Sequence, residues 1–567
     1  MKKSLFLKSI LPAFLLLAVS SSMVSCQSLV DAFFGEVDNP TPSDTSKSDT
    51  SKDEVTDISM LETALTLEAI TDGTIKVNSP KVGMQYTLNG GSKMAVTSTD
   101  INVVAGDIVQ FYGDGTNIAS YDGTMISGGT ADCYIYGNIM SLIDETGFAT
   151  NKKLDVDKTF KELFKFNTHI KNHATKTLEL PATTLTANCY FAMLDSCTSL
   201  TTAPELPATT MADSCYWGMF AWCTSLTTAP ALPATTLAKY CYTTMFSDCT
   251  SLTTAPALPA TTLEEYCYGA MLRNCTSLTT APELPATTLA RGCYQEMFKN
   301  STSLTTSPDL PATTLAPNCY STMFFDCSSL TTAPELPATT LAMACYGSMF
   351  RGCTSITTAP TLPATTLSES CYAGMFSNCS NLTTAPDLPT TTLEFQCYAN
   401  MFSGCTSLTT APDLPATTLT DYCYAAMFRD CTSLTTAPVL PATSLKDYCY
   451  MYMFEGCTSL TTAPDLPATT LADFCYAAMF RNCTSLTAAP ELPATWLNYN
   501  CYIYMFKGCS NLSSVKCLAE NKHHNDVAKD WLNGVSATGT FTKPTSTTFW
   551  PTDDDSGIPT GWTVNDI

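Results

Sequence analysis

Apolar and polar positions recur along most of the chain with a fixed period of 26 residues. The period begins at Leu180 and runs without a slip to Cys517, which gives thirteen frames. One frame, Leu206–Pro230, starts with Leu-Pro-Ala-Thr-Thr-Met and ends with Cys-Thr-Ser-Leu-Thr-Thr-Ala-Pro. Self-similarity at such a period indicates a repeat architecture in which each unit buries its apolar face against its neighbours.

Each frame predicts two short elements joined by a turn. Apolar side chains at i, i+1, i+4, i+5 and i+8 predict one face of a short helix. In the second frame these are Cys215, Tyr216, Met219, Phe220 and Cys223. The Thr-rich segment Leu226–Pro230 predicts a strand, and Pro230 and Pro233 disfavour a helix there and end the strand.

The predicted fold class is an α/β repeat solenoid of 26-residue units, with a parallel sheet on one side and a layer of helices on the other. With strands about 4.8 Å apart, the thirteen units at 180–517 span on the order of 60 Å. Residues 151–179 hold a degenerate unit that we expect to cap the N-terminal end. It matches the apolar columns at Phe160, Leu163, Phe164 and Ile170. Residues 518–567 are expected to cap the other end.

The run Met219–Leu226, which reads Met-Phe-Ala-Trp-Cys-Thr-Ser-Leu, resembles the repeat of the BspA-like leucine-rich-repeat surface proteins of Bacteroidetes. The resemblance covers the array, about three fifths of the chain. The better-known unit of that family is shorter and carries an Ile-Pro strand end, so this 26-residue unit departs from it. The resemblance implies a leucine-rich-repeat fold and a role in attachment to host matrix, host cells or other bacteria.

A small β domain is predicted at residues 60–150. Alternating segments are typical of strands and occur at Leu65–Ala69, Thr74–Val77, Gln85–Leu88, Ile101–Val104 and Ile108–Tyr112. Asn89-Gly90-Gly91 is a hairpin signal. We expect a β-sandwich of immunoglobulin-like size that acts as a spacer or support.

The first 25 residues predict a secretory signal. Three lysines precede the apolar run Leu11–Val19, which is shorter than the roughly 20 residues of a membrane span. The run ends in Met-Val-Ser-Cys, which resembles a bacterial lipobox with Met23 in place of the usual leucine. Cys26 is therefore the expected lipidation site, and a plain secretory signal with an incidental cysteine is the alternative.

Residues 26–59 contain few apolar side chains. They cannot bury enough surface to fold, so they predict a flexible tether. The expected location is the outer membrane or cell surface, with the lipid as the contact to the membrane.

Composition narrows the function classes. Charged residues make up 14% of the chain and hydrophobic residues 45%, which excludes disorder over most of its length. The net charge of −23 argues against a nucleic-acid partner. The chain has only four histidines, which argues against an active site centred on histidine.

The 28 cysteines fall mainly in two columns of the repeat. The first runs from Cys189 to Cys501 in all thirteen frames, and the second from Cys197 to Cys509 in twelve, with Ser301 in the remaining frame. Cysteines eight residues apart on a helix lie roughly 12 Å apart, beyond the roughly 7 Å between α-carbons that a disulfide allows. We expect free, buried thiols acting as small apolar side chains. Seven residues separate the two cysteines of a frame, and the repeat unit contains no histidine. Both features argue against a zinc site, and no metal or cofactor is expected.

Two surfaces could bind a partner. One is an acidic stripe before each Leu-Pro, which could collect Ca²⁺ or basic partners or could serve solubility and edge protection. The stripe comprises Glu179, Glu205, Glu283, Asp309, Glu335, Asp387, Asp413, Asp465 and Glu491. The other is the set of variable positions, expected to be exposed, where recognition competes with neutral drift. Its candidates are Trp217, Trp222, Lys239, Tyr240, Arg273, Arg351 and Tyr452.

The expected function is adhesion, or binding of proteins or glycans on host or other bacterial cells, by a monomeric protein without enzymatic activity. The alternatives are an accessory lipoprotein that captures polysaccharide and a surface carbohydrate hydrolase. A hydrolase needs two acids placed uniquely in a cleft, and repetition supplies the same acids in most frames.

Overall fold

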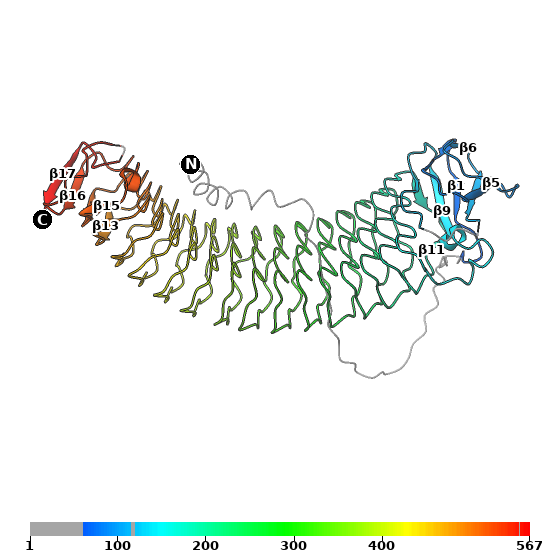
Figure 1. Ribbon diagram of the computed structural model, residues 1–567, viewed down its shortest axis with the longest axis horizontal. Coiled ribbons are helices and arrows are strands. Elements are labelled where there is room, and N and C mark those ends of the chain that lie inside the picture. The colour runs from blue at the N-terminus through cyan, green and yellow to red at the C-terminus, as the bar shows by residue number, and fades with distance from the viewer. Residues whose placement is uncertain (1–59, 115–119, 555) are drawn as a thin grey trace, which may run out of the picture.

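The structure is a computed structural model that describes residues 60–114, 120–554 and 556–567. The predicted signal segment, the tether and Cys26 lie outside the described residues. The described chain forms a long arc of stacked coils, with a β-rich domain at its N-terminal end (Figure 1).

Regular secondary structure is concentrated at the two ends of the arc. The strands are β1 (Thr66–Ala69), β2 (Gly73–Ile75), β3 (Val77–Asn78), β4 (Gln85–Leu88), β5 (Met94–Ala95), β6 (Ile101–Val103), β7 (Ile108–Tyr112), β8 (Met125–Ile126), β9 (Cys133–Asn138), β10 (Ile170–Asn172), β11 (Leu178–Glu179), β12 (Ala488–Leu492), β13 (Trp496–Leu497), β14 (Ser514–Cys517), β15 (Asn521–Lys522), β16 (Gly539–Lys543) and β17 (Trp562–Asp566). The 3₁₀-helices are η1 (Ile139–Leu142) and η2 (Asn525–Ala528).

The N-terminal β domain is built on one seven-stranded sheet with the order β10-β9-β1-β7-β4-β5, in which β11 also pairs with β9. The pairs among β1, β4, β5, β7 and β9 are antiparallel. By contrast, β10 and β11, which come from the predicted capping repeat, pair with β9 in parallel. The expected β-sandwich is not confirmed. Instead, the domain and the start of the array share one sheet through β9.

This sheet forms because apolar side chains alternate with polar ones along its strands. In β7, Val109 and Phe111 are buried, and the residues between and beside them are half-buried. Ile135 of β9 belongs to the same core. Tyr121 stacks on Phe160 with 6.2 Å between ring centroids, which joins this core to the first coil.

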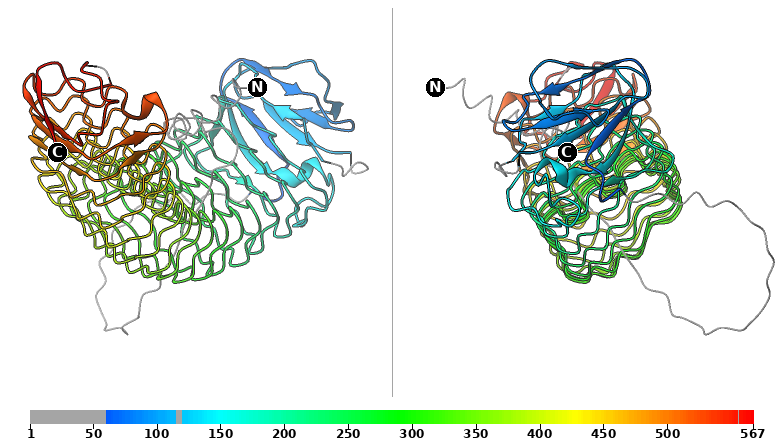
Figure 2. Two further views of the ribbon diagram at one scale, coloured as in Figure 1. Left: turned by 60° about the vertical axis from the view of Figure 1, so that its left-hand side comes forward. Right: turned by 90° about the vertical axis from the view of Figure 1, so that its right-hand side faces the viewer.

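Each 26-residue frame forms one coil, and successive coils stack directly on one another (Figure 2). Backbone hydrogen bonds join them: the amides of Tyr216 and Phe220 donate to the carbonyls of Cys241 and Met245 in the next coil, both at 2.9 Å. The rings of Tyr216 and Tyr242 lie 5.8 Å apart. The predicted repeat solenoid with 26-residue spacing is therefore confirmed.

The coils carry turns where the sequence predicts a layer of helices, so the helix prediction is wrong. In the segment Cys215–Cys223, every second amide donates three residues back, as from Trp217 to Ser214 at 3.3 Å and from Met219 to Tyr216 at 3.2 Å. The amides between them donate to the next coil. An α-helix would donate four residues back and needs about 10 Å of width, which coils with a ring spacing of 5.8 Å do not offer.

Left-handed backbone at every fourth residue produces these turns. The φ angles are 55° at Ser214, 61° at Gly218 and 60° at Trp222. Such angles cost an L-residue about 1–2 kcal/mol, and Asn, Asp and Gly tolerate them best. In every later coil, the position that corresponds to Trp222 holds one of these three residue types. These residues are Asp248, Asn274, Asn300, Asp326, Gly352, Asn378, Gly404, Asp430, Gly456, Asn482 and Gly508.

Replacing Asn482 by valine tests the role of this backbone angle. Asn482 is exposed and has φ 61°, so the substitution changes backbone preference rather than core packing. We expect Asn482→Val to lower the free energy of unfolding by about 1–2 kcal/mol, measured by guanidinium unfolding. The control Asn482→Gly should stay within about 0.5 kcal/mol of the parent, and equal losses from both substitutions would contradict the expectation.

The predicted parallel sheet is reduced to single bridges along most of the array. Thr228 pairs in parallel with Thr202 and Thr254 as isolated bridges. Pro230, two residues later, has no amide to extend the ladder. Near the C-terminus β14 and β16 contain no proline, and a parallel sheet with the order β12-β14-β16-β17 forms there.

Aromatic rings continue the stack beyond the repeats at both ends. Phe160 stacks on Tyr190 at 5.7 Å on the N-terminal side. Trp531 stacks on Tyr502 at 5.9 Å on the C-terminal side, and Trp550 stacks on Trp531 at 4.8 Å. The terminal segments therefore cover rings that would otherwise lose apolar contact at the ends of the solenoid.

Candidate interaction surfaces

The interior of the coils holds the cysteines. All 27 cysteines of the described residues are buried, and none of them forms a disulfide, as expected from the spacing of the two columns. In the second column the thiol donates to a carbonyl 29 residues earlier, as from Cys249 to Phe220 at 3.1 Å. Ser301, the departure in that column, donates to the carbonyl of Leu272 at 2.9 Å in the same way. The second column is thus a ladder of hydrogen-bond donors, a role more specific than the apolar filler expected from the sequence.

Serine should replace a second-column cysteine better than alanine does. Cys249→Ala removes the thiol donor from the Phe220 carbonyl, which still accepts from the Cys223 amide at 3.1 Å, and we expect a loss of about 0.5–1.5 kcal/mol in the free energy of unfolding. Cys249→Ser restores the donor and should lose less. In the first column of the same coil, the sulfur of Cys241 lies 3.7 Å from the carbonyl of Cys267. The advantage of serine should be smaller at Cys241, because this contact is longer than the 3.1 Å of Cys249 and a serine hydroxyl needs a shorter distance. An equal advantage of serine in both columns, measured by denaturant unfolding, would contradict the special role of the second column.

Burial keeps these thiols chemically inert. It raises the pKa of Cys189, Cys371 and Cys475 to about 12, so all three remain protonated at neutral pH. The thiolate is the nucleophile and the metal ligand, and these columns hold little of it. In the described part of the chain, no group of three or more His, Cys, Asp or Glu side chains is placed to bind a metal ion. The cysteines therefore belong to the framework, and binding must be sought on the surface.

The predicted acidic stripe lies on one edge of the coils. Its exposed members are Glu205, Glu283, Asp309, Glu335, Asp387, Asp413, Asp465 and Glu491. Glu179 is half-buried in β11 and accepts hydrogen bonds from the Met60 amide at 3.0 Å and the Thr177 hydroxyl at 2.7 Å. Glu491 forms an ion pair with Lys516 at 2.8 Å. Alanine, threonine or valine replaces the acidic residue in four frames. The stripe is therefore divided into short runs of acidic residues and is not a continuous acidic surface.

Two candidates of the variable face come together in an aromatic ladder. Trp217 stacks on Tyr240 at 5.3 Å, and Tyr240 stacks on Tyr266 at 5.3 Å. Trp222 in the same coil is 53% exposed at a left-handed backbone position. Every later coil holds Asn, Asp or Gly at this position, so Trp222 is an exception on a turn that the coils share.

The charged candidates are largely neutralised within the face. Lys239 pairs with Glu265 at 2.8 Å. Arg273 lies 3.8 Å from Asp248 and 3.6 Å from Glu296. The two remaining candidates take part in cation–π contacts: Arg351 lies 5.3 Å from the Phe325 ring, and Arg429 lies 5.9 Å from the Tyr452 ring. The structure therefore leaves these residues in separate local contacts rather than in one site.

A second aromatic ladder was missed by the sequence reasoning. Tyr422 stacks on Tyr448 at 4.4 Å, and Tyr448 stacks on Phe474 at 4.8 Å. The signal was available, because Asp-Tyr-Cys-Tyr, Asp-Tyr-Cys-Tyr and Asp-Phe-Cys-Tyr occur in three successive frames, from 421 to 476. Outside this run, that position varies and holds residues such as Gly292 and Asn318.

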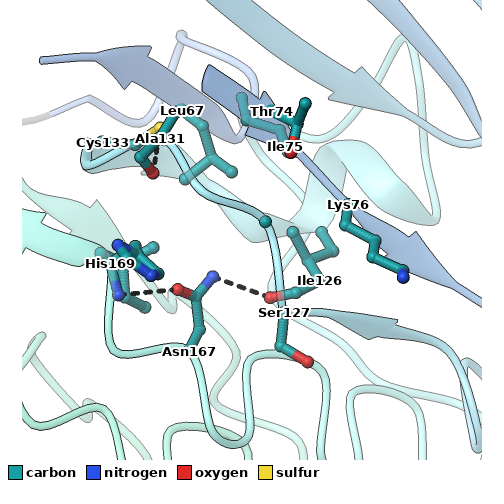
Figure 3. Close-up of a pocket in the computed structure, with 12 residues that line it drawn as sticks. Leu67, Thr74, Ile75, Lys76, Ile126, Ser127, Ala131, Cys133, Asn167 and His169 are labelled. Carbon is teal, nitrogen blue, oxygen red and sulfur yellow. Dashed lines mark hydrogen bonds between the residues drawn. The ribbon is translucent and has the colours of Figure 1, made fainter. Parts of the chain in front are cut away.

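A small cavity lies where the β domain meets the capping repeat (Figure 3). Its volume of about 10 Å³ has room for about one water molecule, whereas ligand pockets measure roughly 300–1,000 Å³. The Asn167 side chain spans it by donating to the Ile126 carbonyl at 2.9 Å and accepting from the His169 amide at 3.0 Å. The cavity is too small for a ligand, and the residues around it connect the β domain to the capping repeat.

Comparison with known proteins supports the family resemblance. Residues 318–461 and 447–536 match the family described as BspA type Leucine rich repeat region, in six copies. A search of curated proteins finds no match. No helix in the described ranges is long and apolar enough to cross a membrane. Repeats of this family are typically non-enzymatic and suggest a role in protein interaction or adhesion. Residues 318–536 of the solenoid are thus similar to BspA-type leucine-rich repeats.

Proposed function

We propose that this chain is a non-enzymatic binding protein, lipid-anchored through Cys26 at the cell surface, that attaches to proteins or glycans of host or bacterial cells. The observation that carries the proposal is the division of each coil into constant and variable columns. Cysteine, tyrosine, methionine and phenylalanine recur in the interior, whereas the lateral positions change from coil to coil. A stack that needs only its interior is free to use the lateral columns for recognition.

Two rival functions lack such support. A hydrolase needs a cleft with two carboxylates in unique positions, whereas the acidic stripe repeats its carboxylates along an edge. A polysaccharide-capturing protein would bind sugars on the faces of aromatic rings, but the rings of both ladders cover one another's faces. A protein ligand is therefore favoured over a glycan for the ladder surfaces.

Protease treatment of intact cells tests the surface location. We expect trypsin to release fragments of the 180–517 array without cell lysis, and we expect Cys26→Ala to shift the protein from the membrane to the soluble fraction. A periplasmic marker protein serves as the control for lysis. Protection of the array until the outer membrane is permeabilised would contradict the proposal.

A further inference from the structure

Two exposed aromatic rings share one corner of the first coils. Phe166 of the capping repeat, Ser196 and Trp222 occupy the same position in three successive coils, with φ angles of 62°, 61° and 60°. The Phe166 amide donates to the Asp195 carbonyl and the Trp222 amide to the Ser247 carbonyl, both at 2.8 Å, so both residues join the following coil in the same way. Phe166 is 60% exposed and Trp222 is 53% exposed. We call Phe166 and Trp222 the aromatic pair.

The shared turn does not require aromatic side chains at this corner. In every later coil the corner holds Asn, Asp or Gly, which tolerate the left-handed backbone best. In the described part of the chain neither ring of the aromatic pair stacks on another ring, in contrast to Trp217 and Tyr240. The Lys165 ammonium lies over one face of Phe166, 5.2 Å from the ring centroid, and the high exposed fraction leaves the other face open to solvent. Both rings are therefore accessible to a ligand.

The spacing of the aromatic pair matches an extended polysaccharide. In the buried ring column of the same coils, the steps are 5.7 Å from Phe160 to Tyr190 and 5.6 Å from Tyr190 to Tyr216. Two such steps separate Phe166 from Trp222 by roughly 10–11 Å along the stack. An extended β-linked glycan of the cellulose or chitin type turns the same sugar face toward a surface once in every disaccharide, and that repeat has a closely similar length.

Polar side chains accompany the two rings. The Ser196 hydroxyl donates to one carboxylate oxygen of Asp195 at 2.8 Å, and the Lys165 ammonium lies 3.3 Å from the other oxygen. The side chains of Lys165 and Asp195 are partly exposed. Ammonium, carboxylate and hydroxyl groups supply the donors and acceptors that sugar hydroxyls need, and a small number of such groups fixes the orientation of a ligand on an apolar surface.

We propose that the aromatic pair binds an extended β-linked glycan. The first and third sugars of one chain stack their C–H groups on the negative ring faces of Phe166 and Trp222, and the sugar hydroxyls between them form hydrogen bonds with Lys165, Asp195 and Ser196. The inference rests on the proposed binding function and names the ligand class for this corner of the array.

A β-linked chain suits this corner better than the alternatives. An α-linked glucan coils or bends, so its sugar faces do not return at a straight, fixed repeat. In an extended peptide, side chains on one face recur every 6.4–6.8 Å or so, which does not match the two-coil spacing of the aromatic pair. The aromatic ladders differ from the pair because their rings cover one another, and they remain the surfaces for a protein ligand.

Binding of the full chain to insoluble cellulose and chitin, with cross-linked dextran as the α-linked control polymer, tests this inference. The test variants Phe166→Asn and Trp222→Asn place at the corner a residue type that later coils use, so the turn keeps its backbone. The control Trp496→Thr removes another exposed tryptophan and restores the residue type of Thr470, one frame earlier. We expect the Kd for at least one β-linked polymer to rise about tenfold in each test variant and less than about twofold in the control.

Two further measurements test the spacing. The variant Ser196→Trp/Trp222→Asn keeps two exposed rings but places them one coil apart, and we expect it to bind no better than Trp222→Asn. A soluble β-linked hexasaccharide should compete with the polymer, whereas the disaccharide is too short to reach both rings and should not.

Three results would overturn the inference. They are an equal loss of binding in Trp222→Asn and Trp496→Thr, restored binding in Ser196→Trp/Trp222→Asn, and a parent chain that binds neither cellulose nor chitin or binds dextran equally well. Capture of matrix proteins by a parent chain that binds no glycan would leave the proposed function standing. Guanidinium unfolding of Trp222→Asn should match or exceed that of the parent, because asparagine suits the left-handed backbone.

Discussion

Raising the pH above about 9 is expected to unfold the coil array cooperatively. The thiols of Cys189, Cys371 and Cys475 have an ordinary pKa of 9.0, which burial raises to about 12 in the folded state. Between these two values the unfolded chain loses protons that the folded chain keeps. The stability contributed by the protonated thiols is therefore fully present below pH 9 and is lost as the pH rises toward 12.

The size of this effect follows from the number of thiols. Each raised thiol lowers the free energy of unfolding by about 1.4 kcal/mol per pH unit in that window. Ten cysteines have a pKa near 12, so together they remove roughly 14 kcal/mol per pH unit. That is comparable with the whole stability of a typical domain, about 5–15 kcal/mol.

Circular dichroism and thiolate absorbance recorded together against pH in a reducing buffer measure the transition. We expect both signals to change at the same pH, and the folded signal to return on acidification. Replacing Cys353, Cys379 and Cys405 by serine should make the pH dependence shallower. Thiolate appearing near pH 9 in a protein that stays folded would refute the burial argument.

Replacing Phe376 by alanine should strongly destabilise the middle of the array. Phe376 is fully buried and stacks on Phe350 at 5.6 Å and on Phe402 at 5.8 Å. The cavity should lower the free energy of unfolding by about 3–5 kcal/mol. Because each coil contacts only its neighbours, the break should also let the two halves of the array unfold separately.

Guanidinium unfolding followed by circular dichroism, with hydrogen exchange to locate the break, measures this loss. Thr384→Ala in the same frame is the matched control, since Thr384 is exposed, and should change stability by no more than about 0.5 kcal/mol. A loss in Phe376→Ala no larger than in the control would show that ring stacking does not hold the coils together.

The sequence predicted the repeat and its buried columns but not the backbone that presents them. Cys215, Met219 and Cys223 recur every four residues, a spacing that suits a helix face and a ladder of four-residue turns equally well. The discriminating signal was Asn, Asp or Gly at positions such as Asn274 and Gly404, which a left-handed backbone requires. Those positions were interpreted as variable surface.

The candidate surface was predicted only in part, because composition does not show which side chains meet. Trp217 and Tyr240 lie in different columns of different frames, so no spacing rule predicts that they stack. Lys239 was predicted as an exposed candidate of the variable face, and its ion pair with Glu265 was not foreseen. The ladder of Tyr422, Tyr448 and Phe474 could be found only by comparing three successive frames at one column, whereas each member of the acidic stripe was visible within a single frame.

The central claim is that the lateral columns bind a partner, whereas the interior columns only build the stack. Capture of purified extracellular-matrix proteins by the immobilised chain tests this claim most directly. The variant Tyr422→Asn/Tyr448→Asn/Phe474→Asn removes the second aromatic ladder and places there the residue type that Asn318 and Asn500 supply in other coils. We expect the variant to keep the far-ultraviolet circular dichroism spectrum of the parent and to lose most of the capture. Undiminished capture by a correctly folded variant would contradict the claim.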